Sequence, residues 1–196
     1  MRYGLFDADS RELDGTGSGL AYRPRIAPIV PKLETLYRLA EREGWPLVFS
    51  TCCSGHMLPA NGLPGVLHVP LDPRETGWQE RVPEFRTFYV AKKSYGDPKI
   101  NGACRAFDMF QDNGNVARLI RMLAVEEWVV FGNGFDLCVG SAARGLLAAG
   151  ARVLLLEDVR VSSAAGTPES EARTIGELRR AGARVTTIAQ FVEELA

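Results

Sequence analysis

The sequence predicts a three-layer α/β protein, in which helices cover both faces of one mostly parallel β-sheet. Short apolar segments alternate with segments of helical periodicity along the whole chain. The short segments are apolar at successive positions, which is typical of strands buried on both faces and therefore of parallel sheets. The chain has 196 residues, 46% of them hydrophobic, which is enough to bury one core. We expect residues 1–196 to form a single domain.

Six short apolar segments are expected to be strands. They are too short for helices, and most are rich in β-branched or aromatic residues. In chain order they are Tyr3–Phe6, Pro46–Ser50, Phe88–Ala91, Trp128–Phe131, Val153–Leu156 and Arg184–Ile188.

Five segments between and after these strands have helical spacing of apolar residues. Glycines directly follow several of them and mark their ends, as Gly44 does for the first. The expected helices are Ile29–Glu43, Val116–Leu123, Leu137–Ala149, Glu169–Ala181 and Ala189–Leu195. Two long stretches, 11–28 and 52–85, are expected to be irregular, and loops of that length are usually functional or disordered. Trp78 in the second stretch is expected in a polar loop, at the pocket or at a subunit contact.

Composition excludes several function classes. A formal net charge of −1 argues against a nucleic-acid or membrane-surface partner held by bulk electrostatics. No apolar segment is long enough to span a bilayer, and the first residues do not resemble a signal peptide. The four cysteines do not form a disulfide framework, so we expect free thiols and a cytoplasmic protein.

Residues capable of chemistry follow three of the predicted strands. In an open α/β sheet the ligand site lies beyond the carboxyl ends of the strands. Asp7 follows the first strand, Lys92 follows the third, and the turn from Gly132 to Cys138 follows the fourth.

Cys138 is the candidate nucleophile. It lies at or near the start of a predicted helix, where the helix dipole and unpaired backbone N–H groups favour a thiolate and can stabilise an oxyanion. The alternative, a buried cysteine that acts as a small apolar residue, remains open from this segment alone. A dinucleotide site is not predicted, because Leu137 stands where a GxGxxG motif requires its third glycine.

The segment GNGFDLCVGSAARGLLAAG resembles the nucleophile segment of the isochorismatase-like cysteine hydrolases. Three further segments resemble that family in the same order. YGLFDAD resembles the strand that ends in the catalytic aspartate, here Asp7, and YVAKKSY resembles the strand that ends in the catalytic lysine, here Lys92. VLLLEDVRVSS resembles the next strand, with Asp158 at its end. The resemblance implies a Rossmann-like sheet of order 3-2-1-4-5-6.

The resemblance implies a catalytic triad of Asp7, Lys92 and Cys138. Asp7 would accept the thiol proton and Lys92 would support the anionic partners. The backbone N–H groups of Cys138 and Gly134 would form the oxyanion hole, and the family pattern implies a cis peptide between Asn133 and Gly134. Lys93 competes with Lys92 for the role of triad lysine.

The position of Tyr95 and the strand register favour Lys92 over Lys93. The chain also departs from the family pattern. Asp9 stands where the family often has glutamine, and a second carboxylate there could raise the pKa of Asp7. The segment 52–71 lacks the Asp-x-His metal pattern of nicotinamidases, which argues against nicotinamide as substrate.

Cys52, Cys53, His56 and His68 are close in sequence and have side chains that suit Zn²⁺. Their spacing matches no standard zinc site, so we predict no metal and no other cofactor. We expect a pocket lined near the triad, with these members: Asp9, Cys52, Cys53, His56, Tyr95 and Phe135.

The predicted function is hydrolysis of a C–N bond in a small amide through a thioester on Cys138. Two alternatives remain. One is an isochorismatase-type vinyl-ether hydrolase, which needs an acid at Asp7 and no thiol. The other is a non-catalytic binding or assembly member of the fold. The expected partners are a small-molecule substrate and, by resemblance to the family, further copies of the chain in a homodimer or homotetramer.

Overall fold

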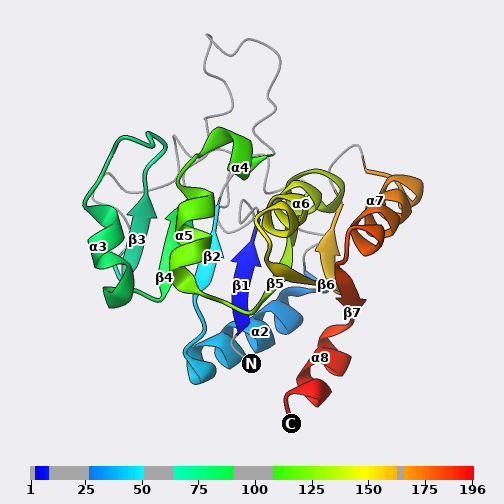
Figure 1. Cartoon of the computed structure of the whole chain (residues 1–196). Coiled ribbons are helices and arrows are strands. Elements are labelled where there is room, and N and C mark those ends of the chain that lie inside the picture. The colour runs from blue at the N-terminus through cyan, green and yellow to red at the C-terminus, as the bar shows by residue number, and fades with distance from the viewer. Residues whose placement is uncertain (1–2, 9–26, 51–63, 91–107, 163–165) are drawn as a thin grey trace.

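Seven parallel strands form one sheet in the computed structural model, which describes residues 3–8, 27–50, 64–90, 108–162 and 166–196. The strand order is β3-β4-β2-β1-β5-β6-β7, and every neighbouring pair is parallel (Figure 1). The strands are β1 (Tyr3–Asp7), β2 (Leu47–Phe49), β3 (Val66–Val69), β4 (Thr87–Val90), β5 (Glu127–Asn133), β6 (Arg152–Val161) and β7 (Arg184–Thr186).

The sheet confirms the predicted fold class and adds one strand. The six predicted strands correspond to β1, β2, β4, β5, β6 and β7, and their order in the sheet is the predicted 3-2-1-4-5-6. The additional strand, β3, pairs with β4 at the edge and lies in a stretch expected to be irregular. It escaped prediction because it has only four residues between Pro64-Gly65 and Pro70, and such punctuation is typical of loops.

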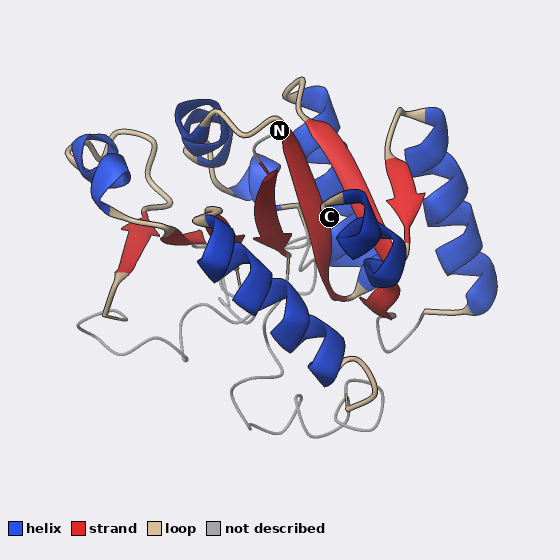
Figure 2. Cartoon of the chain, turned by 90° about the horizontal axis from the view of Figure 1, so that it is seen from below, coloured by secondary structure: helices blue, strands red, loops and turns tan. Residues whose placement is uncertain are grey.

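Helices cover both faces of the sheet (Figure 2). One face is covered by α2 (Val30–Glu43) and α8 (Ile188–Glu194). The other is covered mainly by α5 (Val116–Leu123), α6 (Gly140–Ala148) and α7 (Pro168–Arg180). The shorter helical segments are α3 (Trp78–Arg81), η2 (Val82–Glu84), α4 (Met109–Asp112) and η3 (Phe135–Val139).

Side chains of β1 alternate between two hydrophobic clusters, one on each face. Leu5 packs in the cluster beneath α2 and α8, whereas Phe6 packs in the cluster beneath α5 and α6. Because successive side chains of a strand point to opposite faces, Asp7 lies on the same face as Leu5, the face covered by α2. This alternation decides which helix can reach the aspartate.

Trp78 is buried, and the expectation of an exposed loop tryptophan is wrong. It is the first residue of α3 and is 6% exposed. Its ring belongs to the same cluster as Val69 and Val82, so the apolar contact area of the indole is used inside the fold.

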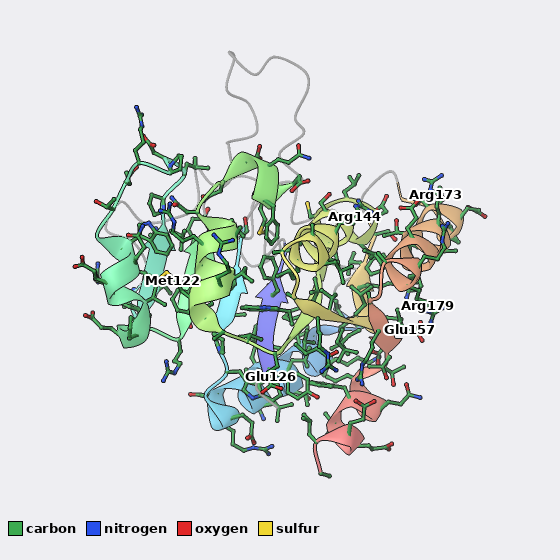
Figure 3. The ribbon with its side chains drawn as sticks, viewed as in Figure 1. Met122, Glu126, Arg144, Glu157, Arg173 and Arg179 are labelled. Atoms are coloured by element: carbon green, nitrogen blue, oxygen red, sulfur yellow. The ribbon has the colours of Figure 1, made fainter. Side chains whose placement is uncertain are left out.

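The outer surfaces of the helices are polar. Arg144 on α6 and Arg173 and Arg179 on α7 lie at the surface on one side of the molecule (Figure 3). Arg144 Nη1 lies 3.5 Å from Glu177 Oε2, an exposed ion pair that joins α6 to α7. Within the described ranges, no helix combines the length and the apolar character needed to cross a membrane.

Candidate active site

The carboxyl ends of β1, β2 and β5 are joined directly beside Asp7. Ala8 N–H donates to the Phe131 carbonyl at 3.0 Å, and Ser50 N–H donates to the Asp7 carbonyl at 3.1 Å. Asp7 pairs in register with Phe49 on β2 and with Phe131 on β5. Phe131 is three residues before Gly134, so the end of β1 adjoins the strand that leads to Cys138.

Asp7 is 5% exposed, and α2 covers the face of the sheet on which it lies. The Tyr37 hydroxyl donates to Asp7 Oδ2 at 3.0 Å. The Tyr37 ring packs edge-on against Phe131, with 6.0 Å between the ring centroids. Burial, and then the charge and hydrogen bond of Asp7, raise the pKa of Tyr37 well above its usual value, so the phenol stays neutral.

Sequence reasoning missed Tyr37, although a signal was present. Leu33, Tyr37 and Ala40 are spaced i, i+4 and i+7, which places them on one face of α2. Leu33 and Tyr37 pack against the cluster that contains Ala40. A hydroxyl within an apolar helix stripe needs a buried partner, and the nearest polar side chain at the adjacent strand ends is Asp7.

The turn after β5 is sharp because Gly134 is left-handed. Gly134 has φ 67° and ψ 53°, a conformation that costs little for glycine only. The described residues contain no cis peptide bond, so the Asn133–Gly134 bond is trans and the predicted cis peptide is wrong. The left-handed glycine makes the turn that the cis bond was expected to make.

Cys138 lies in a single π-helical turn, Phe135–Val139, that leads into α6. Leu137 N–H and Val139 N–H both donate to the Gly134 carbonyl, at 2.9 and 3.2 Å. The helical segment therefore begins at Phe135, two residues before the predicted start. Such π-turns are frequent at functional sites.

The thiol of Cys138 lies against Gly134. Cys138 is 2% exposed and is not in a disulfide. A Cβ atom at Gly134 would lie 3.6 Å from Cys138 Sγ, so the glycine leaves the backbone bare directly beside the sulfur.

Phe135 and Arg160 form the side of the site nearest β6. Phe135 is 1% exposed, and Arg160 Cζ lies 5.3 Å from its ring centroid. Arg160 Nε donates to Glu171 Oε2 at 3.1 Å. Arg160 also lines a cavity of about 320 Å³, together with Val161, Ser162, Gly166, Thr167, Pro168 and Glu171.

Two buried polar atoms at these strand ends have no hydrogen-bond partner within the described part of the chain. They are Ser50 Oγ, at the end of β2, and Asn133 Oδ1, at the end of β5. Ser50 is 0% exposed and Asn133 is 4% exposed. Unsatisfied buried groups are rare in proteins, and a ligand or a water molecule is the usual partner.

Asp158 has a structural role on β6. Lys32 Nζ, at the start of α2, donates to Asp158 Oδ2 at 2.8 Å. Ile188 N–H, at the start of α8, donates to Asp158 Oδ1 at 2.9 Å. One carboxylate thus fixes both helices of this face, including the helix that carries Tyr37.

Several predicted residues lie outside the described ranges. They are Asp9, Cys52, Cys53, His56, Lys92, Lys93 and Tyr95. β4 ends at Val90, two residues before Lys92, so the third predicted strand end also lies at this edge of the sheet. His68 is described, on β3, with its ring centroid 5.2 Å from that of Tyr89. In the described part of the chain, no group of three His, Cys, Asp or Glu side chains could hold a metal ion.

The isochorismatase domain matches residues 13–190, most of the chain. The chain belongs to the isochorismatase family. The matched range contains Lys92 and Cys138 and begins after Asp7. A search of curated protein sequences gave no match.

Solved structures with the same fold are distant in sequence. A pyrazinamidase of Pyrococcus horikoshii, solved in complex with zinc, has 19% identity and a TM-score of 0.63, over 95% of this chain and 99% of that chain. An N-carbamoylsarcosine amidase from Thermoplasma acidophilum has 17% identity and a TM-score of 0.58, over 96% and 97%. A cysteine hydrolase from Pseudomonas syringae pv. phaseolicola has 15% identity and a TM-score of 0.59, over 98% and 91%. At these identities the likeness establishes the fold, a hydrolase fold in each of these neighbours.

Proposed function

We propose that this protein hydrolyses the C–N bond of a small amide through a thioester on Cys138. The observation that carries the proposal is the contact of a buried, unbridged thiol with a left-handed glycine in the turn after β5. β5 pairs with β1, whose last residue is the buried Asp7. A nucleophile and an acid–base group on adjacent strand ends are what acyl transfer requires.

The reaction needs one proton carrier and one oxyanion site. Asp7 takes the proton of the Cys138 thiol, and the sulfur attacks the amide carbonyl carbon. The carbonyl oxygen becomes an oxyanion, held by the N–H groups of Cys138 and Gly134. The N–H groups of Leu137 and Val139 are already bonded to the Gly134 carbonyl, so they are not candidates. Asp7 then returns the proton to the leaving amine, and the C–N bond breaks.

Water completes the cycle. Asp7 accepts a proton from a water molecule that attacks the thioester, and the sulfur leaves as the thiolate and recovers that proton. Lys92 is proposed as the cation that supports the negative charges of the thiolate and the carboxylate. Ser50 Oγ can donate a hydrogen bond to a small substrate or accept one from it, and Asn133 Oδ1 can accept one; neither has a partner among the described residues.

The neighbours favour an amide over other substrates. Two of them are named as amidases of small molecules, pyrazinamidase and N-carbamoylsarcosine amidase. The matching family takes its name from isochorismatase, and a vinyl-ether hydrolase would need no thiol. We also propose that the chain acts as a homodimer or homotetramer on a small-molecule substrate.

The test is the pH dependence of Cys138 alkylation by iodoacetamide, read by mass spectrometry. Cys52, Cys53 and Cys104 of the same chain serve as internal reference thiols. We expect Cys138 to react far faster than these three near neutral pH, and Asp7→Asn and Lys92→Ala to slow it. Lys93→Ala is the matched control for Lys92→Ala and should leave the rate unchanged.

Other outcomes would contradict the thioester mechanism. If Cys138 reacts like the reference thiols and neither substitution changes its rate, the thiol is not activated. Thermal unfolding of each variant separates loss of activation from loss of fold. If Cys138→Ala retains hydrolysis of a vinyl ether, the alternative reaction replaces the proposed one.

A further inference from the structure

Asn133 is a buried asparagine whose side-chain oxygen has no hydrogen-bond partner within the described part of the chain. It is 4% exposed and is the last residue of β5, directly before Gly134. A buried polar group without a partner costs the free energy of removing it from water. Such groups are rare in folded proteins, and each one calls for a physical reason.

A second buried asparagine shows how the fold satisfies this side chain where its role is structural. Asn115, at the start of α5, is 0% exposed. Its Nδ2 donates to the carbonyls of Pro70 and Asp72, at 3.0 and 3.1 Å, and its Oδ1 accepts from Arg118 Nη1 at 3.4 Å. The described residues give Asn133 Oδ1 no comparable bond, so holding the fold together does not account for an amide at this position.

The strand register places Asn133 on the same face of the sheet as Asp7. Phe131 pairs in register with Asp7 and packs in the cluster beneath α2 and α8. Because side chains alternate along a strand, Asn133, two residues after Phe131, lies on that face as well. Asn133 therefore shares a face with the proposed acid–base group, and in the chain it directly precedes Gly134 of the proposed oxyanion hole.

We propose that Asn133 determines the substrate class of this site: its Oδ1 accepts a hydrogen bond from the N–H of the leaving nitrogen. This inference rests on the proposed function, in which Asp7 returns a proton to that nitrogen, so the nitrogen lies on the face that Asp7 and Asn133 share. The bond selects amides whose leaving nitrogen carries a hydrogen. An ester or a thioester of the same acid, or a fully substituted amide, has no N–H to donate.

The burial of Oδ1 makes this selection effective. A site that is built to hydrogen-bond a substrate group rejects an analogue without that group, because the buried acceptor then stays unpaired. The leaving nitrogen also becomes positively charged when Asp7 protonates it, and an N–H of a charged group is the stronger donor. The bond to Asn133 therefore strengthens as the C–N bond breaks, which favours the transition state over the bound substrate.

The experiment forms two adducts of nearly equal shape on Cys138 and compares their rates of formation. Isocyanic acid, supplied as potassium cyanate, gives S–C(=O)–NH2: the sulfur adds to the carbon and the nitrogen takes a proton. The ester p-nitrophenyl acetate gives S–C(=O)–CH3 and releases p-nitrophenolate. Both carbonyl groups occupy the position of the thioester, and only the first adduct carries an N–H. Mass spectrometry of Cys138, with Cys104 as the reference thiol, measures both rates.

The test variant is Asn133→Leu, which keeps the size of the side chain and removes its oxygen, and Asn115→Leu is the matched control. We expect Asn133→Leu to slow carbamoylation of Cys138 about fivefold, the effect of one hydrogen bond, and to leave acetylation within about twofold. Its urea midpoint should not fall below that of the wild type, because leucine needs no hydrogen-bond partner. Asn115→Leu should lower the urea midpoint and leave the ratio of the two rates unchanged.

The outcomes that contradict the inference are distinguishable from failure of the proposed function. If Asp7→Asn slows alkylation of Cys138 but Asn133→Leu keeps the wild-type ratio of carbamoylation to acetylation, the proposed function stands and the role of Asn133 is wrong. Equal slowing of both reactions by Asn133→Leu also overturns that role, because no effect is then specific to the N–H. If wild-type Cys138 reacts like Cys104 with every reagent, the proposed function fails, and the inference fails with it.

Discussion

Two buried carboxylates lie at opposite ends of the parallel strands, and different groups contact them. Asp7, at the carboxyl end of β1, accepts a hydrogen bond from the neutral hydroxyl of Tyr37. Glu127, at the amino end of β5, is 1% exposed and lies between two arginines. Its Oε1 is 3.6 Å from Arg152 Nη2 and 3.5 Å from Arg184 Nε. Burial first, and then the charge of the neighbouring acid, raises the pKa of a tyrosine beside each carboxylate, Tyr37 beside Asp7 and Tyr3 beside Glu127.

The two sets of contacts suggest different tasks. The proposed function has Asp7 exchange a proton, whereas the ion pairs of Glu127 hold neighbouring elements together. Two guanidinium groups pair with Glu127, and Arg184 also bonds Glu194 of α8 at 2.6 Å. The Tyr37 hydroxyl that bonds Asp7 is a neutral donor, whereas Glu127 is paired with two cations. Through its arginines Glu127 is connected to β6, β7 and α8 at the amino ends of the strands, whereas Asp7 lies at the carboxyl ends, where the proposed function places the reaction.

The largest expected effect is that Asp7→Asn and Glu127→Gln affect different properties. The first should lower the reactivity of Cys138, and the second should lower the stability of the fold. Asp7→Asn should lower the rate of Cys138 alkylation at neutral pH by about 1000-fold, within the usual contribution of an acid–base group. Glu127→Gln should leave that rate within about twofold. It should lower the free energy of unfolding by about 1–3 kcal/mol, because it removes the charge that two arginines share. Alkylation kinetics and urea unfolding of both variants provide the measurement.

The same pair of variants can break the comparison. Equal loss of Cys138 reactivity in both would mean that the two carboxylates act through the stability of the whole sheet. In that case it would be wrong to assign Asp7 to the reaction and Glu127 to the stability of the fold.

The turn after β5 gives the next largest effect, through Gly134→Ala. A left-handed alanine costs about 1–2 kcal/mol of stability. The new methyl group would also lie 3.6 Å from the sulfur, beside the proposed oxyanion hole. Misplacement on this scale can cost about 100-fold in rate, and we expect a loss of that order.

Gly44→Ala is the matched control for this substitution. Gly44 ends α2 with φ 64°, close to the 67° of Gly134, and a Cβ there would meet nothing within 4 Å. It should show a similar loss of stability with normal alkylation. If both variants react normally, the space between Gly134 and Cys138 is not used by the reagent.

Much of the fold could be predicted because its strands are short, uninterrupted apolar runs. Trp128–Phe131 and Val153–Leu156 are recognisable from sequence, and both lie inside the observed strands β5 and β6. β3 could not be predicted, because its four residues gain their strand identity from pairing with β4. Trp78 was misjudged for the same reason, since its polar sequence neighbours gave no sign of the cluster beneath α3.

The candidate site was predictable where it depends on strand ends and not where it depends on contacts between distant segments. Asp7 and Cys138 were singled out because each follows a buried strand, and their catalytic roles stay predictions. The Tyr37–Asp7 bond joins residues 30 apart, and only the packing of α2 on the sheet brings them together. The trans peptide before Gly134 was missed because the family pattern was applied to a turn whose left-handed glycine reverses the chain differently.

A smaller effect is expected at Asp158, a residue of β6 that accepts hydrogen bonds from the starts of α2 and α8. Asp158→Ala removes the hydrogen bonds from Lys32 and from Ile188 N–H. We expect the free energy of unfolding to fall by about 1–2 kcal/mol, since Lys32 is partly exposed and the ion pair is screened. Cys138 alkylation should change less than it does in Gly134→Ala. If the alkylation rate falls strongly while the free energy of unfolding hardly changes, Asp158 belongs to the site itself.

The smallest effect concerns His68. Its register partner on β4 is Tyr89, which pairs with Phe49 on β2, and Phe49 pairs with Asp7 on β1. Burial lowers the pKa of His68, and among the described residues its buried Nε2 has no hydrogen-bond partner, so the fold favours the neutral ring. The unfolded chain binds a proton near pH 6.5 and the folded chain binds it only at lower pH, so stability falls as the pH drops through this window. His68→Phe should reduce that fall, because the variant has no imidazole to protonate in the unfolded chain. Unfolding by urea at pH 7.5 and pH 5 measures the difference, with His56→Phe as the control for the other histidine. A variant that loses as much stability as the wild type would show that the acid sensitivity arises from other groups, and that the neutral imidazole at the edge of the sheet has no energetic consequence.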